Sequence, residues 1–347
     1  MAKHTVGLVE VANAAGVSTT TVHRALRGTG RISEATRNRI LEVAQSLGYR
    51  PNHAARSLRT RHTATLGVVF GSLGVSFFAE LLAAVESTAR ESGYSTLIAV
   101  SDASPDKERE RVDLLLEKGA EGLLVSPTDP EINRDYYRDL LAQQVPLVFV
   151  DCFIPGLAVG SVSTDNERGG YLAGRHLLAA GRQRLALLDY PPRSRVLTSV
   201  QGRWDGFGRA LAEAGLPAPA LIGSDLPGTV PSEEYGYASM CDFLDQGGEL
   251  DGCFVVHDAL AYGAMAALRE HGVRLPEDVA LVGFDDLAPS GYTFPPLTSV
   301  RQPVERLGRE AIGLLTRILT APFGGPPPQI LLEPTLTIRR SCGEPPS

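Results

Sequence analysis

Residues 12 to 26 combine hydroxyl, imidazole and guanidinium side chains within the spacing of two short helices joined by a tight turn. Ala12, Gly16 and Val22 follow the helix-turn-helix spacing, in which a small residue, a turn glycine and an apolar residue let the helices pack closely. Ser18 is placed to cap the second helix through a main-chain amide. The start of that helix presents side chains suited to base edges in the major groove: Thr19, Thr20, His23 and Arg24. For the spacing alone, an ordinary helical hairpin is the alternative.

Charge is divided unequally along the chain. The first 62 residues carry ten Lys and Arg against three acids, a net charge of +7. The whole chain has 33 basic and 40 acidic residues, so the remaining 285 hold 23 and 37, a net charge of −14. This asymmetry predicts a front segment that meets phosphate and a body that does not.

Length and composition are typical of a soluble globular protein with a small head and a large body. The 347 residues are 43% hydrophobic and 21% charged. No apolar run approaches the roughly 18 residues of a membrane span, and the first residues lack the hydrophobic core of a secretion signal, so we expect a cytoplasmic protein. Cysteines and histidines are scattered without metal-ligand or redox spacing, so we expect no disulfide, metal or cofactor. The cysteines are Cys152, Cys241, Cys253 and Cys342.

Short segments complete the expected head and linker. We expect a first helix from Leu8 and a third helix that Ser33 opens and Gly48 ends. Asn52 could cap a short helix over 54–59, which is too short to be stable alone and would fold against DNA or a partner chain.

From Leu66 onward, short apolar runs alternate with amphipathic segments. Strands are expected over 66–70, 96–100, 122–125, 146–150, 185–188, 253–256 and 279–283. Helices are expected over 77–92, 106–118, 166–180, 203–214, 232–246, 259–271 and 303–319. This alternation predicts doubly wound parallel sheets, and its length favours two similar lobes with a ligand cleft at the carboxyl ends of the strands.

Three charged side chains fall where such a cleft would lie. Asp151 follows the strand 146–150, Asp285 follows the strand 279–283, and Arg203 opens a helix. Two carboxylates and a guanidinium suit a hydroxyl-rich ligand, because each can bond neighbouring hydroxyls; interlobe salt bridging is the alternative.

Two other classes of protein, an enzyme and a sugar receptor for transport, are alternatives to a DNA-binding protein with this ligand cleft. An enzyme could use Asp151, Asp285 and His257 as acid and base around a glycosidic bond. We expect no enzyme, because no nucleophile motif, phosphate loop or metal cluster accompanies them. A sugar receptor for transport would suit the body alone, but the basic head and the missing export signal argue against it.

Eight segments together resemble the LacI/GalR family of bacterial transcription regulators, over nearly the whole chain. They are 11–22, 32–37, 47–52, 55–60, 165–170, 203–207, 275–286 and 295–302. The resemblance implies an N-terminal all-α helix-turn-helix head and an α/β two-lobed, periplasmic-binding-protein-like (type I) effector domain. The implied domains are the head at 1–50, a hinge helix and linker at 51–64, and the effector and dimerisation domain at 65–347. The first lobe would hold 65–163 and 297–325, and the second 164–296 and 326–340.

The same resemblance implies roles in DNA binding. Thr19, Thr20 and Arg24 fall on groove-reading positions, and a surface phosphate contact is the alternative for Arg24. Leu58 falls on the hinge leucine that wedges into the minor groove, with a core leucine beneath the hinge as its alternative. Arg56, Arg59 and Arg61 would neutralise phosphates. The other residues expected to contact DNA are Ser18, Thr21, His23, Asn52 and Ala55.

Effector residues are implied in the same way. Ser126 and Ser199 fall on ligand positions, and Phe77 and Phe78 resemble a ring-stacking pair, with lobe packing as the alternative. His257 stands where the family has asparagine, and the loop 224–232 lacks the aromatic residue that often closes the pocket. We expect a sugar effector; a nucleobase, nucleoside or phosphorylated metabolite is the alternative.

The implied mechanism is a homodimer that binds a pseudo-palindromic double-stranded operator and represses transcription. Effector binding would close the lobes and change the hinge, so effector and operator affinities would be coupled reciprocally. The sequence does not fix the sign of that coupling. The tail after residues 335–340 lacks leucine heptads, which argues against a tetramer-forming helix.

Overall fold

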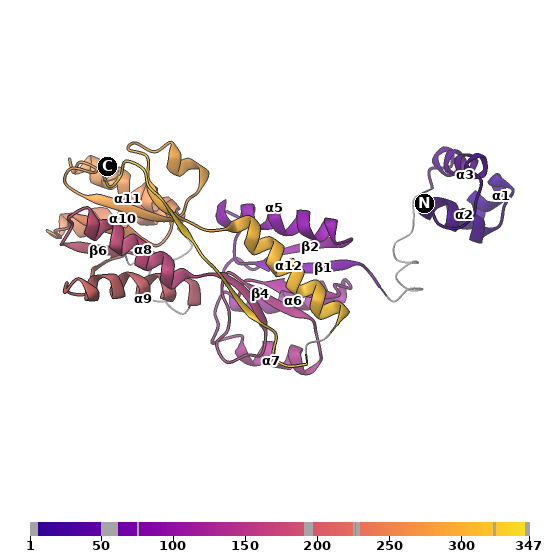
Figure 1. Cartoon of the computed structure of the whole chain (residues 1–347), viewed down its shortest axis with the longest axis horizontal. Coiled ribbons are helices and arrows are strands. Elements are labelled where there is room, and N and C mark those ends of the chain that lie inside the picture. Colours follow the sequence, from indigo (N-terminus) through magenta and orange to yellow (C-terminus); the bar gives the residue numbers. More distant parts are fainter. Residues whose placement is uncertain are drawn as a thin grey trace. The chain divides into compact units, whose positions relative to one another are not determined.

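The computed structural model (Figure 1) describes residues 6–49, 62–74, 76–190, 197–224, 226, 230–321 and 324–343. The chain divides into two compact units, Met1–Thr63 and Ala64–Ser347. We call the first unit the head and the second unit the body.

Three helices form the head: α1 (Leu8–Ala15), α2 (Thr19–Arg27) and α3 (Glu34–Ser46). The predicted starts are confirmed, since Ser18 accepts a hydrogen bond from the amide of Thr21 and Ser33 accepts one from the amide of Thr36. The α1–α2 turn passes through Gly16 at φ 66°, which a residue with a side chain adopts only with strain. The helices close over a small core of Val11, Ala12, Ala15, Val22, Ala25, Ile40 and Ala44.

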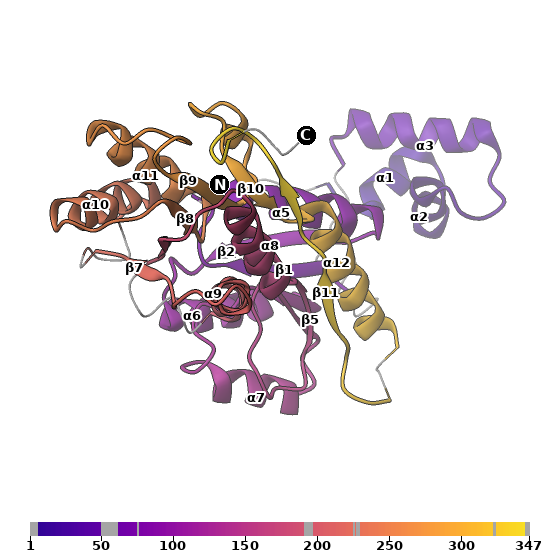
Figure 2. The same ribbon diagram turned by 60° about the vertical axis from the view of Figure 1, so that its left-hand side comes forward.

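Two six-stranded sheets form the body (Figures 1 and 2), as the alternating pattern predicts. The first sheet, in the order β11-β5-β4-β3-β1-β2, is parallel throughout. Its strands are β1 (Thr65–Phe70), β2 (Ser95–Val100), β3 (Gly122–Val125), β4 (Leu147–Val150), β5 (Gly160–Thr164) and β11 (Gln329–Leu332). The second sheet has the order β12-β10-β9-β8-β6-β7, and only β12 runs antiparallel to its neighbour. Its strands are β6 (Leu185–Leu188), β7 (Ala220–Ile222), β8 (Gly252–Val255), β9 (Ala280–Asp285), β10 (Thr298–Arg301) and β12 (Thr335–Thr337).

Helices cover both faces of each sheet, which is why inner strands such as β1, β3, β4, β6 and β8 are mainly apolar. In the first lobe, α5 and α12 pack on one face and α6 and α7 on the other. These helices are α5 (Ser76–Glu91), α6 (Pro105–Glu117), α7 (Arg134–Ala142) and α12 (Val304–Thr320). The second lobe has α8 (Asn166–Ala179), α9 (Thr198–Glu213), α10 (Ser232–Asp245), α11 (Asp258–Glu270) and the short 3₁₀ helix η2 (Ala288–Gly291).

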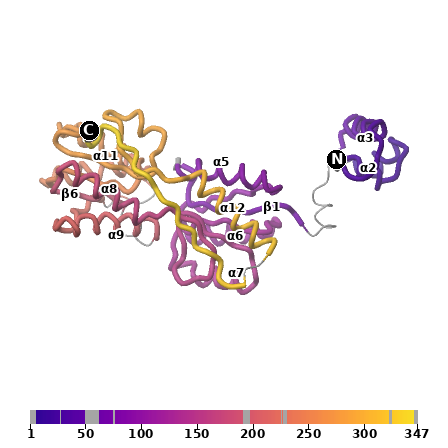
Figure 3. The backbone as a smooth tube through the Cα atoms, viewed as in Figure 1, coloured from indigo at the N-terminus to yellow at the C-terminus, as the bar shows by residue number. Residues whose placement is uncertain are grey.

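The chain crosses between the lobes three times, and two of the crossings differ from the expected boundaries. β10 pairs with β9 in the second sheet, although residues 297–325 were expected in the first lobe. β11 pairs with β5 in the first sheet, although 326–340 were expected in the second lobe. The crossings therefore follow β5, β10 and β11. Figure 3 shows the last of them as the yellow segment that leaves the first lobe for the second.

Candidate functional site

The helix α2 presents its polar side chains on the surface of the head. Thr19, Thr20 and Arg24 are exposed, whereas Val22 and Ala25 are buried against the other two helices. Thr21 and His23 are half-buried, and Ser18 is used for the helix cap. This division follows from the helical period, which turns one face of α2 to the core and the other to solvent.

The side chain of Arg24 has a defined neighbour. Its Cδ lies 3.1 Å from the point that a Cβ on Gly30 would occupy, so the alkyl part of the arginine runs along the loop that follows α2. Gly30 also has a φ of 81°, which favours glycine. The hinge candidates Asn52, Ala55, Arg56 and Leu58, and the phosphate candidates Arg59 and Arg61, lie outside the described residues.

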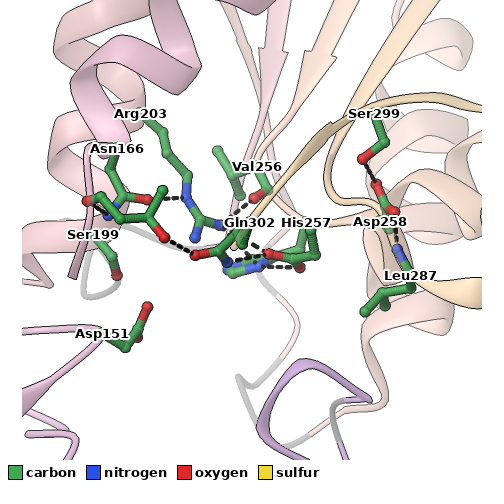
Figure 4. A network of polar contacts seen from close by, with 12 residues as sticks. Asp151, Asn166, Ser199, Arg203, Val256, His257, Asp258, Leu287, Ser299 and Gln302 are labelled. Atoms are coloured by element: carbon green, nitrogen blue, oxygen red, sulfur yellow. Dashed lines mark hydrogen bonds and ion pairs between the residues drawn. The ribbon is translucent and has the colours of Figure 1, made fainter. Parts of the chain in front are cut away.

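In the body, Arg203 is the centre of a buried polar cluster (Figure 4). Its side chain is 1% exposed, and its Nε donates to Oδ1 of Asn166 at 2.9 Å. Its Nη1 donates to the carbonyl of Val256 at 2.6 Å, and the guanidinium lies 3.7 Å from the ring centre of Phe284. Arg203 was expected to open a helix, but α9 begins at Thr198, so Arg203 lies in the second turn of that helix.

Close packing of α8 against α9 fixes the position of this arginine. A Cβ on Gly170 would lie 2.0 Å from the carbonyl oxygen of Arg203, and one on Gly206 would lie 1.8 Å from the carbonyl oxygen of Glu167. Only glycine permits this approach of the two helix backbones. The glycines therefore hold Arg203 against the ends of β8 and β9.

Asp285 and His257 complete the cluster from neighbouring strand ends. Oδ1 of Asp285 lies 3.8 Å from Nη1 of Arg203 and accepts a hydrogen bond from Nε2 of Gln302 at 2.8 Å. Nδ1 of His257 lies 3.2 Å from Oδ2 of Asp285 and 3.1 Å from Nη1 of Arg203. Gln302 in turn accepts a hydrogen bond from Thr164 at 2.6 Å, which links the cluster to the last strand residue of the first lobe before the crossing.

Asp151 faces this cluster from the end of β4 in the first lobe (Figure 4). Burial raises the pKa of its carboxyl group, although the nearby Arg203 opposes that rise. Among the described residues, the hydrogen bond given to its carboxylate comes from the thiol of Cys152, at 3.4 Å. A buried carboxylate held by so weak a donor has acceptor capacity left for a ligand.

Two contacts join the lobes beside Asp151. Sγ of Cys152 lies 3.1 Å from Oγ of Ser199, and the amide of Phe153 donates to Oγ1 of Thr198 at 3.1 Å. The predicted effector residue Ser199 is thus buried and in contact with the opposite lobe.

The two phenylalanines lie at the start of α5. Phe77 is 4% exposed and belongs to the core of the first lobe, which favours the packing interpretation for this residue. Phe78 is half-buried, with its ring centre 5.2 Å from those of Phe70 and Phe77. Ser126 is buried directly after β3, where its amide donates to the carbonyl of Val69.

An open groove of about 640 Å³ lies between the lobes, next to the cluster. Glu80 of α5 and Arg306 of α12 line it from the first lobe, and Asp285 and Asp286 line it from the second. Among the predicted effector residues, Asp285 borders this groove. Asp286 itself is neutralised by Arg301 and Arg339, at 2.6 Å and 2.7 Å.

Three residues of the site were missed in the sequence. Asn166 and Gln302 support Arg203 and Asp285, and both lie in segments that carry the family resemblance. Tyr190, two residues after β6, packs with its ring centre 6.0 Å from that of His257 and 5.3 Å from that of Tyr235. The loop 224–232, which follows β7, lacks an aromatic residue. Tyr190 provides an aromatic side chain after β6, the strand that pairs with β7.

In the part of the chain that the structure describes, no group of three or more His, Cys, Asp and Glu is placed to hold a metal ion. No helix within that part has the length and apolarity that crossing a membrane requires.

Comparison with known proteins gives two matching family models and several long relatives. The lacI family of bacterial regulatory proteins matches residues 7–52, and the periplasmic binding protein-like domain matches residues 175–342. The HTH-type transcriptional repressor PurR of Haemophilus influenzae is 32% identical over 339 residues, which cover 96% of this chain and 97% of the relative. The HTH-type transcriptional regulator GalR of Salmonella typhimurium is also 32% identical over 339 residues, covering 97% and 96%.

A solved structure extends this similarity to three dimensions. The Lac repressor dimer bound to operator and the anti-inducer ONPF superposes with a TM-score of 0.86 at 27% identity, covering 98% of this chain and 100% of that chain. The named relatives are transcriptional regulators rather than enzymes. The chain belongs to the lacI family of bacterial transcriptional regulators.

Proposed function

We propose that this regulator is a repressor whose operator affinity is controlled by a neutral sugar bound between the two lobes of the body. The proposal rests on two buried carboxylates, Asp151 from the first lobe and Asp285 from the second, that both interact electrostatically with the buried Arg203. Carboxylate and guanidinium groups bond neighbouring hydroxyls in pairs, as a sugar ring presents them.

Charge favours a neutral ligand over an anionic one. Asp151 and Asp285 outnumber the single guanidinium of Arg203, so these three side chains carry a net negative charge when both carboxylates are ionised. A phosphorylated metabolite would have to overcome repulsion from both carboxylates in a site of low dielectric. Phe78 and Tyr190 would supply apolar surface for the CH face of a sugar ring.

A thermal-shift screen tests the effector class directly. Purified protein would be mixed with neutral monosaccharides and disaccharides, with nucleobases and nucleosides, and with sugar phosphates. We expect a neutral sugar to raise the unfolding midpoint, because a ligand that binds only the folded state stabilises it by mass action. A shift by nucleobases alone would replace the sugar with the alternative effector class.

For DNA, we propose that Thr19, Thr20 and Arg24 read base edges while a homodimer spans two half-sites. The exposure of these side chains supports the first part, because a groove-reading group must be available to the duplex. Selection from a random duplex library is expected to yield a pseudo-palindromic site. Recovery of no preferred sequence would contradict the proposal.

Two exposed aromatic residues support the homodimer. Tyr292 and Phe294, after η2, are 91% and 93% exposed, so both rings are available to contact a second copy of the chain. We expect the double variant Tyr292→Asp, Phe294→Ser to shift sedimentation toward the monomer and to weaken binding to the two-half-site operator. An unchanged dimer would exclude these residues from the interface.

A further inference from the structure

The imidazole of His257 lies between two groups with opposite hydrogen-bonding requirements (Figure 4). Its Nδ1 is 3.1 Å from Nη1 of Arg203, which can only donate, and 3.2 Å from Oδ2 of Asp285, which as a carboxylate can only accept. A ring nitrogen carries either a proton or a lone pair. Nδ1 can therefore satisfy only one of these two neighbours.

Asp285 has the stronger need for this nitrogen. Its side chain is 1% exposed, and its Oδ1 is already bonded to Gln302. Among the described residues, Oδ2 has Nδ1 of His257 as its donor. Without a proton on Nδ1, a buried carboxylate oxygen would face a lone pair, and leaving a buried charged group without its partner is expensive.

Arg203 can do without His257 as an acceptor. Its Nε is bonded to Asn166 and its Nη1 to the carbonyl of Val256, and its plane packs over the ring of Phe284. Asp285 at 3.8 Å still balances its charge. The neutral tautomer with the proton on Nδ1 therefore satisfies more of the buried groups than the tautomer with the proton on Nε2.

This tautomer determines whether Nε2, on the other edge of the imidazole ring, donates or accepts a hydrogen bond. Nε2 then carries a lone pair and no hydrogen, and the His257 side chain keeps 24% exposure where its two partners keep 1% each. We propose that His257 is a specificity-determining residue that presents a hydrogen-bond acceptor to the effector. It selects a donating group, such as a sugar hydroxyl or an amine, and disfavours the phosphate or carboxylate of an acidic ligand, which only accepts.

This inference rests on the proposed effector cleft, but its first test needs no effector. Long-range ¹H–¹⁵N correlation spectra would be recorded on the full-length protein at pH about 8, where histidine side chains are mostly neutral. The chain has seven histidines, so the His257 signals would be assigned by their loss in His257→Asn. We expect a protonated Nδ1 and an unprotonated Nε2. A protonated Nε2 on His257 would overturn the inference and leave the sugar proposal standing.

Asp285→Asn is the control for the cause of this tautomer. The amide can donate where the carboxylate could only accept, so the proton of His257 is expected to move from Nδ1 toward Nε2. An unchanged tautomer in this variant would show that Asp285 does not set it.

The second test measures selectivity, which a purely structural histidine would not change. Dissociation constants would be compared for wild type and His257→Asn, with a neutral sugar that binds and with the phosphate ester of the same sugar. The asparagine amide both donates and accepts, so we expect the preference for the neutral sugar to fall about tenfold, the equivalent of one hydrogen bond. An unchanged preference would overturn this inference alone. Binding of the phosphate ester only, in wild type, would overturn both this inference and the sugar proposal.

Discussion

The α2 surface of the head and the polar cluster of the body hold similar side chains in opposite states. Thr19, Thr20 and Arg24 are exposed on α2. The side chains of Arg203 and Asp285 are each 1% exposed and are fixed by hydrogen bonds with Asn166, Val256 and Gln302. The α2 surface must form its polar contacts with a binding partner, whereas the buried cluster around Arg203 has already formed most of its contacts within the body.

Specificity and stability are therefore expected to be separate in the head and coupled in the body. In the head, new contacts to phosphates and bases would supply the affinity, which should depend strongly on salt. In the body, preorganised groups reduce the entropy lost on binding, but they also hold the two lobes together. Substitutions of the exposed α2 side chains should therefore alter DNA binding alone, whereas substitutions in the cluster should alter folding and effector binding together.

The largest expected effect is the loss of stability in Arg203→Met. The substitution removes the guanidinium beside Asp285 and leaves a buried carboxylate without its counter-ion. We expect the free energy of unfolding of the body to fall by about 3–5 kcal/mol. Urea denaturation followed by fluorescence would measure it, because the single tryptophan, Trp204, adjoins Arg203 in α9.

Arg209→Met is the matched control on the same helix. Arg209 is 46% exposed and pairs with Glu167 at 2.6 Å on the surface. An exposed ion pair contributes at most about 1 kcal/mol, so this variant should unfold nearly as the wild type does. Equal losses in the two variants would mean that burial of Arg203 adds nothing to its contribution to stability, and that the buried cluster does not differ from an exposed surface in this respect.

The next effect is a pH dependence of the body. Burial raises the pKa of Asp258 to about 8 from an ordinary 3.8, and the nearby Asp285 adds to that rise. The pKa of Asp258 is higher in the folded protein than in the unfolded chain, so protonated Asp258 stabilises the folded state. This contribution to stability is complete below pH about 3.8 and is lost as pH rises through about 8. We expect the urea midpoint of wild type to fall between pH 5 and 9 more than that of Asp258→Asn.

Asp278 provides the control for this prediction. Its hydrogen bond to Arg274 lowers its pKa to about 2, below the whole range of the measurement. Asp278→Asn should therefore leave the slope of stability against pH unchanged. If the stability of Asp258→Asn fell with pH as steeply as that of wild type, a group other than Asp258 would account for the pH dependence.

Much of the fold could be predicted because the inner elements have strong local patterns. The apolar runs of β1, β3, β6 and β8 and the amphipathic helices between them lie within a few residues of their predicted bounds. Five strands and α7 were missed. β5 reads GlySerValSerThr, β7 and β12 have three residues each, and β11 has a single buried residue, so their pairing partners rather than their own sequences define them.

Some residues of the site could also be predicted from the sequence, and others could not. Asp151 and Asp285 could be found because each follows an apolar run that predicts a strand; in the structure Asp285 lies 3.8 Å from Arg203, and Asp151 faces the same cluster (Figure 4). Asn166 and Gln302 could not, because their positions depend on where the chain crosses between the lobes. Both crossings are set by pairing between strands far apart in the sequence, which local periodicity does not report.

A smaller effect is expected from Arg24→Ala in the head. An arginine that bonds a base pair contributes about 1–3 kcal/mol of discrimination, so affinity for the selected operator should fall by that amount. The unfolding of the head should not change, because Arg24 is exposed. Fluorescence anisotropy on operator and on unrelated duplex would separate the two possible roles. Equal weakening on both would make Arg24 a phosphate contact.

The smallest effect comes from the two serine caps, which form a matched pair. Ser18 and Ser33 each accept a hydrogen bond from an amide three residues later, at 3.2 Å, and each also contacts a threonine hydroxyl. We expect Ser18→Ala and Ser33→Ala to destabilise the head equally, by about 1 kcal/mol, as amide exchange in the head would show. Only Ser18 begins the helix that presents Thr19, Thr20 and Arg24, so only Ser18→Ala should also weaken operator binding beyond that loss. If both variants lost operator affinity equally, the two caps would affect DNA binding only through the stability of the whole head. The result would then not support α2 as the element that reads DNA.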